Sequence, residues 1–211
     1  EDWITAVLKP PTEAVRKRLA ALEIWRASRP AAGTLAETYL RARGLALPAG
    51  CRWLRFHPRL PHRPSGETWP AMVAAVRDGA DARFLGVHRT YLRADGSGKA
   101  AVDPVKMSLG PIAGGAVRLA PAGARLICGE GIESTLGAMA ASALPGWAAL
   151  STSGLKAIKL PAEVREIIIA ADGDRPGEEA ALVAARRWAA EGRAVRIARA
   201  PGAKDFGDAI A

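Results

Sequence analysis

The sequence predicts an α/β protein in which a C-terminal Rossmann-like parallel sheet, flanked by helices, follows a smaller basic α+β region. After residue 124, strand-like and helix-like segments alternate, which is typical of a parallel sheet covered by helices. Between about 51 and 119, short strand-like runs are separated by Gly- and Asp-containing turns, which favours antiparallel strands. The excess positive charge of the chain lies entirely before residue 119.

The charge distribution separates the two regions. Residues 1–118 contain 19 Lys and Arg against 10 Asp and Glu, whereas residues 119–211 contain 11 of each class. This asymmetry is typical of a polyanion-binding region joined to a balanced one. The competing interpretation is a soluble protein that is simply rich in Arg and Ala.

Cysteine content and hydropathy bear on where the protein works. Cys51 and Cys128 are too few for a disulfide framework, so we expect a cytoplasmic, reducing environment. No apolar stretch approaches the roughly 20 residues of a membrane-spanning helix, and we therefore expect no membrane partner.

The N-terminal segment, 1–33, is predicted to be helical over 12–27. Thr12 can accept hydrogen bonds from the first backbone N–H groups. Apolar residues at steps of four, three and three predict one buried face, made of Val15, Leu19, Leu22 and Trp25. Pro30 and Gly33 then interrupt the helix.

Residues 34–118 form the predicted basic α+β region. It begins with a short helix over 34–45, in which Thr34 and Glu37 make a capping box and Gly44 a stop signal. Strand-like runs follow at 71–78, 83–92 and 115–120. Basic side chains are spread along the region: Arg77, Arg83, Arg89, Arg93, Lys99, Lys106 and Arg118.

Residues 119–211 form the predicted parallel α/β region. Its strand-like segments are 124–130, 147–151, 166–172 and 194–200. Helices are predicted at 132–144 and 176–191. The second has Pro176 in its first turn and Gly192 at its end, which are the favoured places for these residues.

Three of these strands lead into acidic residues. Glu130 follows the first, Asp172 and Asp174 follow the third, and Asp205 comes after the last. In open α/β sheets ligands bind beyond the carboxyl ends of the strands, so a parallel sheet would gather these acids on one edge. Clustered carboxylates require a counter-charge, and hard oxygen ligands suit Mg²⁺ or Mn²⁺. Taken singly, the two aspartates could be turn residues and Glu130 a helix cap.

The second half resembles the Toprim domain, which is shared by bacterial-type DNA primases, type IA and II topoisomerases and some nucleases. The likeness covers roughly 119–211 and rests on "LICGEGIESTLGA", "IIIAADGDRPGEEAA" and "GAKDFGDAI". It implies Glu130, Asp172 and Asp174 as catalytic acids, and the same three with Asp205 as metal ligands. One position departs from the primase pattern EGxxD, because Ser134 stands where the second acid is usual and Glu133 stands beside it. Glu133 is either the replacement acid, or the second acid is dispensable.

The first half is similar, more loosely, to the basic subdomain of primase RNA-polymerase cores. "AETYLRARGL" resembles the helix before that core in phage-type helicase-primases. The resemblance implies that Arg89 and Lys106 face the nucleotide or the template, and Lys204 in the Lys-Asp element completes the predicted cofactor-binding set. Primases also carry a zinc-binding domain, which here would lie upstream of residue 1.

The leading hypothesis is therefore a DNA primase-like nucleotidyltransferase. Its partners would be single-stranded DNA and nucleoside triphosphates, with a replicative helicase as a further candidate. Two alternatives stay open: a Toprim metal-dependent nuclease, and a non-catalytic DNA-binding or assembly module of a mobile element. A topoisomerase requires a nucleophilic tyrosine, and the two tyrosines, Tyr39 and Tyr91, lie in predicted core segments.

Overall fold

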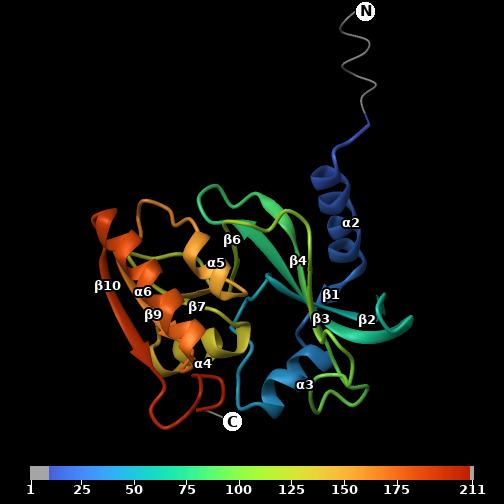
Figure 1. Cartoon of the computed structure of the whole chain (residues 1–211). Helices are drawn as coiled ribbons and strands as arrows, with labels where there is room; N and C mark the ends of the chain where they lie inside the picture. Colours follow the sequence, from blue (N-terminus) through green and yellow to red (C-terminus); the bar gives the residue numbers. More distant parts are fainter. Residues whose placement is uncertain (1–9, 210–211) are drawn as a thin grey trace, which may run out of the picture.

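The computed structural model describes residues 10–209, and its strands join into one sheet with helices on both faces (Figure 1). The ten strands are β1 (Arg29–Pro30), β2 (Leu54–His62), β3 (Glu67–Asp78), β4 (Phe84–Tyr91), β5 (Lys106–Leu109), β6 (Gly115–Arg118), β7 (Arg125–Gly129), β8 (Gly146–Ala148), β9 (Glu166–Ala171) and β10 (Ala194–Arg199). This architecture confirms the predicted α/β class.

The parallel part of the sheet has the order β8-β7-β9-β10. All three of its neighbouring pairs are parallel, and Ile168 of β9 lies between Ile127 of β7 and Arg196 of β10. The continuous apolar runs that predicted these strands are buried in β7 and β9 because helices cover both faces of the sheet.

The antiparallel part is built around the long strand β3. Strand β4 pairs with one edge of β3, while β2 and then β6 follow one another along the other edge. Strand β6 also pairs with β8, through Val117 opposite Ala148. The two predicted regions therefore share a single hydrogen-bonded sheet.

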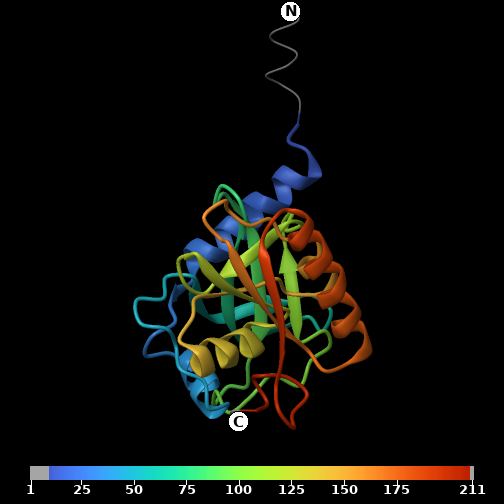
Figure 2. The same ribbon diagram turned by 90° about the vertical axis from the view of Figure 1, so that its left-hand side faces the viewer.

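The helices are α2 (Glu13–Ala27), α3 (Leu35–Ala42), α4 (Ile132–Ser142), α5 (Thr152–Ala157) and α6 (Arg175–Ala190). Helices α3 and α4 bury their apolar residues on one face of the sheet, whereas α2, α5 and α6 cover the other. Figure 2 shows α4 and α6 on opposite sides of the parallel strands. None of the helices in residues 10–209 has the length and apolar character needed to span a bilayer.

Helix α2 forms where predicted, with the Thr12 hydroxyl accepting from the backbone N–H of Val15 at 3.4 Å. The predicted buried face is wrong in its first half, because Leu19 is 51% exposed. Burial comes instead from Ala21 and Trp25, which pack on β3 and β4. The physical reason is that α2 turns Arg16, Lys17 and Ala20 toward a groove against β4 and β5, and Leu19 lies outside this groove.

Four elements were not predicted, the first being the two-residue strand β1 at Arg29–Pro30. Strand β2 contains Pro58 and Pro61, which argue against a strand; Pro58 falls in a register shift between His57 and Leu60, whereas Pro61 stays paired with Thr68. Strand β5 has four residues and α5 has six, which is too short for a recognisable periodicity.

Candidate active site

The predicted acids come from the carboxyl ends of parallel strands. Glu130 directly follows β7 and Asp172 directly follows β9. Beside Asp172, the backbone N–H of Gly173 donates to the carbonyl oxygen of Lys204 at 2.7 Å. This bond ties the loop after β10, which carries Asp205, to the end of β9.

Asp174 and Asp205 are each held by backbone N–H groups. Asp174 caps α6, accepting from the N–H of Gly177 at 2.9 Å, and its other oxygen lies 3.7 Å from the Lys204 ammonium. Asp205 accepts from the N–H groups of Gly207 and Asp208 at 2.7 and 2.9 Å. Both side chains are therefore fixed in orientation, each with one oxygen engaged by the backbone.

Burial and neighbouring carboxylates raise the pKa values of Glu130 and Asp172. Burial, then Asp172 and Asp174, raise the pKa of Glu130 to about 7. Burial, then Asp205 and Asp174, raise the pKa of Asp172 to about 6. These shifts mean that the carboxylates lie close enough to repel, which is costly unless a cation neutralises them.

Two buried oxygens at this edge have no hydrogen-bond partner within the described part of the chain, Oε1 of Glu130 and Oδ1 of Asp172. Oxygens of this kind fit a hard divalent ion such as Mg²⁺ or Mn²⁺. Among residues 10–209, no group of three or more His, Cys, Asp or Glu side chains is arranged to hold a metal ion by itself. An ion here would thus take its remaining ligands from water or from phosphate oxygens.

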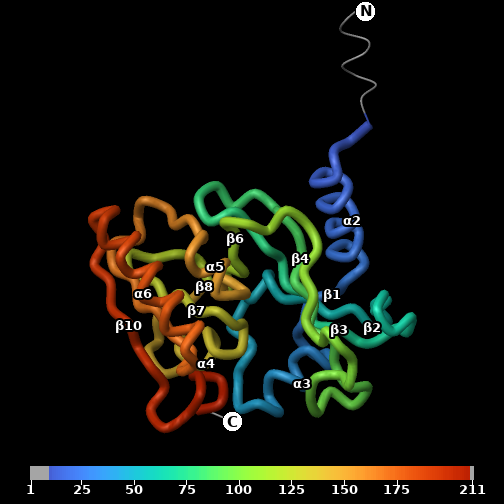
Figure 3. Tube along the Cα trace, viewed as in Figure 1, coloured from blue at the N-terminus to red at the C-terminus, as the bar shows by residue number. Residues whose placement is uncertain are grey.

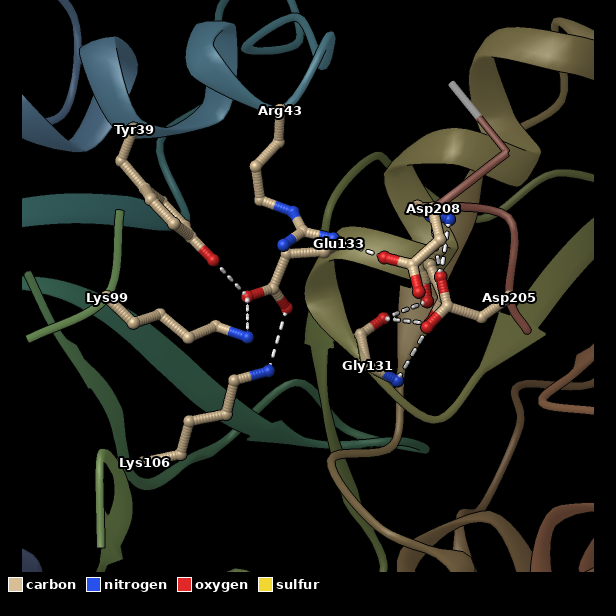
Figure 4. Close-up of polar contacts among 11 residues, drawn as sticks. Tyr39, Arg43, Lys99, Lys106, Gly131, Glu133, Asp205 and Asp208 are labelled. Atoms are coloured by element: carbon tan, nitrogen blue, oxygen red, sulfur yellow. Dashed lines mark hydrogen bonds and ion pairs between the residues drawn. The ribbon is translucent and has the colours of Figure 1, made fainter. Parts of the chain in front are cut away.

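A pocket of about 250 Å³ opens beside the acids. Cationic and anionic side chains both line it, together with Gly131 and Ser134: Arg43, Lys99, Lys106, Lys204, Glu133, Asp172, Asp205 and Asp208. Figure 4 shows Lys99 and Lys106 reaching in from one side and Asp205 and Asp208 lying on the other. The pocket therefore offers cations for phosphate next to carboxylates for a metal.

Glu133 belongs to the cationic side of this pocket. Its Oε1 accepts from the Tyr39 hydroxyl at 2.6 Å and lies 3.7 Å from the Lys99 ammonium, while its Oε2 lies 3.0 Å from Lys106 (Figure 4). Both oxygens of Glu133 are therefore engaged on the cationic side of the pocket. The Ser134 hydroxyl accepts from the backbone N–H of Gly131 at 3.2 Å, at the start of α4.

Helix α3 contributes residues that the sequence patterns did not single out. Tyr39 meets Glu133 across 94 positions of the chain, and Arg43 forms an ion pair of 2.6 Å with Asp208. A helix far upstream carries no local signal of such contacts. The one available clue was the resemblance of "AETYLRARGL" to a segment of primase cores.

Arg89 is not brought to the acids or to Lys106. Side chains alternate along a strand, and Arg89 shares the face of β4 that packs against α2 with Val87 and Tyr91. Its guanidinium donates to the carbonyl oxygens of Met107 and Ser108, both at 3.4 Å. It lines a separate groove whose other basic residues are Arg16, Lys17 and Arg63.

The loop that carries Asp205 packs directly on α4. The backbone of Phe206 lies so close to Gly137 that an added Cβ would fall well inside van der Waals contact with the Phe206 carbonyl oxygen. The path of the chain in Figure 3 shows this C-terminal loop passing beside α4. Gly137 is thus needed for the close approach rather than for its backbone angles.

We expect Gly137→Ala to displace the Asp205 loop, lowering the free energy of unfolding by about 1–3 kcal/mol and weakening metal binding. Denaturant titration and Mn²⁺ titration would measure the two effects. Gly98→Ala is the matched control, because its added Cβ would meet only the Arg93 side chain at 3.8 Å. Equal behaviour of the two variants would contradict the packing argument.

Family models match both halves of the chain. Residues 15–119 match a domain of unknown function (DUF7146), and residues 125–211 match the Toprim domain. The chain contains a Toprim domain. No curated protein matches this Toprim-domain protein in sequence.

Solved primase structures share the fold of the Toprim-domain protein. A DNA primase domain from Pseudomonas aeruginosa is 16% identical with a TM-score of 0.56, covering 90% of this chain and 73% of that one. The primase fragment of the bacteriophage T7 primase-helicase is 18% identical with a TM-score of 0.53, covering 86% and 67%. The Aquifex aeolicus primase structure, which includes its zinc-binding domain, is 14% identical with a TM-score of 0.60. The match covers 95% of this chain and 59% of that one. The fold is that of a primase catalytic core.

Proposed function

We propose that this Toprim-domain protein is a primase-like nucleotidyltransferase, which synthesises short primers on single-stranded DNA by metal-dependent phosphoryl transfer. The observation that carries the proposal is the pocket in which strand-end carboxylates face ammonium and guanidinium groups. A nucleoside triphosphate with its divalent ions is complementary to both sets of charges.

The acids would hold the ions. Glu130 and Asp172 contribute the buried oxygens that have no other partner, and Asp174 and Asp205 contribute carboxylates already oriented by the backbone. Divalent ions bound there would neutralise phosphate charge and favour attack of a 3′-hydroxyl on the α-phosphate.

The cationic side chains would bind the triphosphate. Lys106 and Lys99 line the pocket opposite the acids, and Lys204 lies beside Asp174. Ammonium groups form charge-assisted hydrogen bonds to phosphate oxygens, which positions the nucleotide. No covalent enzyme intermediate is required, which accords with the burial of Tyr39 and Tyr91.

The template would be held by the excess positive charge of residues 1–118. Phosphate contacts of this kind supply affinity without sequence preference. Arg89 lies outside the pocket, in the basic groove between α2 and β4–β5, so its proposed contact is with the template rather than the nucleotide. A DnaG primase catalytic domain, one of the fold neighbours, was solved bound to single-stranded DNA, which supports this choice of template.

The test is incubation of the protein with circular single-stranded DNA, labelled ribonucleotides or deoxyribonucleotides, and Mg²⁺ or Mn²⁺. We expect new labelled oligonucleotides that disappear on chelation of the metal. Linearised or shortened template without new oligonucleotides would replace the proposal with a nuclease. DNA binding with neither reaction would indicate a non-catalytic module.

A further inference from the structure

The cationic side of the pocket contains one carboxylate with an unusual set of partners. Glu133 lies in the first turn of α4 and is 6% exposed. Burying a carboxylate is costly unless it is paired and hydrogen-bonded. Here two ammonium groups and one hydroxyl supply the pairing, from Lys99, Lys106 and Tyr39.

Glu133 stays ionised in this environment. Burial alone would raise the pKa of Glu133, but Lys106 and Lys99, with the hydrogen bond from Tyr39, lower it to about 2. Burial and the Glu133 carboxylate raise the pKa of Tyr39, so its hydroxyl remains a donor. The cluster therefore consists of one anion and two cations, with an excess positive charge.

The two oxygens of Glu133 are held unequally. Oε1 is fixed by the buried Tyr39 hydroxyl at 2.6 Å, with Lys99 at 3.7 Å. Among residues 10–209, Oε2 has Lys106 as its one polar partner, at 3.0 Å, and the Lys106 side chain is 33% exposed. Lys106 can thus exchange a carboxylate oxygen for a phosphate oxygen without disturbing the buried end of Glu133.

We propose that Glu133 is an internal counter-anion that stands where a ligand phosphate binds, neutralising Lys99 and Lys106 in the free protein and yielding Lys106 to the ligand. This deepens the proposed function, on which it rests, and makes Glu133 a positioning residue rather than a metal ligand. Glu133 keeps the lysines extended toward the pocket. A ligand must compete with the Glu133 carboxylate for Lys106, so that only a highly charged polyphosphate displaces this carboxylate.

This competition predicts that removing the charge of Glu133 strengthens the binding of anions to the pocket. Glu133→Gln retains the length of the side chain and an oxygen to accept from Tyr39, but leaves both lysines without a carboxylate. We expect inorganic tripolyphosphate, without metal, to bind the variant about tenfold more tightly than the wild type, because one nearby negative charge is lost. Tripolyphosphate should also raise the melting temperature of the variant more than that of the wild type.

The measurement is calorimetric titration with tripolyphosphate, with Glu163→Gln as the control, because Glu163 is exposed and remote from the pocket. A variant that loses stability without gaining tripolyphosphate affinity would overturn the proposal, since Glu133 would then only join α3 to α4. The assay involves neither metal nor polymerisation, so it can succeed or fail independently of primase activity.

A second pair of variants keeps the test informative if Glu133→Gln does not fold. Lys106→Met leaves Glu133 paired with Lys99 alone, and the double variant with Glu133→Gln removes one charge of each sign. We expect the double variant to bind tripolyphosphate more tightly than Lys106→Met, because Lys99 is then unneutralised. Equal or weaker binding by the double variant would contradict the proposal.

Discussion

Asp172→Asn is expected to reduce primer synthesis by roughly a thousandfold, because it removes the negative charge of a proposed metal ligand. The same change should make the metal-free protein more stable. Burial, then the Asp205 and Asp174 carboxylates, raise the pKa of Asp172 to about 6, so an ionised Asp172 destabilises the metal-free fold. After discounting for solvent screening at this half-exposed group, the gain at pH 8 is about 1 kcal/mol.

A loss of primer synthesis together with a gain in stability would distinguish this outcome from simple unfolding. Denaturant titration without metal and primer synthesis with Mn²⁺ would be measured on the same preparation. Glu163→Gln, which removes an exposed carboxylate of the same half, should change neither quantity. A variant that is both inactive and less stable would mean that Asp172 supports the fold rather than the chemistry.

Lowering the pH from about 8 to about 5.5 is expected to weaken Mn²⁺ binding by about a hundredfold. The pKa of Glu130 is raised to about 7 and that of Asp172 to about 6, so both bind protons in this range. A metal ion must displace those protons, and its apparent affinity falls as they bind. Isothermal titration at several pH values would measure the effect. Glu130→Gln should make the affinity for Mn²⁺ less dependent on pH near pH 7.

In the metal-free protein, stability is expected to change with pH in the opposite direction to the affinity for Mn²⁺. A carboxyl group whose pKa is raised in the folded state does not destabilise the fold when it is protonated, and destabilises it most when it is ionised. Stability from Glu130 and Asp172 should therefore fall as the pH rises from about 4 through 7. Saturating Mn²⁺ should cancel this loss. A pH-independent affinity for Mn²⁺ would show that these two carboxylates do not bind the ion.

The convergence of Glu130, Asp172 and Asp205 could be anticipated because it depends only on strands being parallel. Apolar runs identified the strands, and parallel strands end at a common edge. The structure adds that the backbone N–H of Gly173 joins the end of β9 to the loop carrying Asp205. This part of the site follows from local patterns and one topological rule.

The cationic side could not be derived in that way, because it depends on pairing register. Thr90 of β4 lies opposite Lys106 of β5, whereas Arg89 lies opposite Met107. Neighbouring residues of a strand point to opposite faces, so Lys106 enters the pocket and Arg89 does not. The contact between Tyr39 and Glu133 required the docking of α3 beside α4, for which no periodicity exists in the sequence.

The pairing of β6 with both β3 and β8 has a consequence for how this protein can vary. A break after Arg118 would strip β8 of its antiparallel neighbour and expose unpaired backbone groups there. Neither half of the chain can consequently be exchanged independently of the other. Recombination that exchanges one of them must also supply a replacement for Gly115–Arg118 that fits the partner strand on each side.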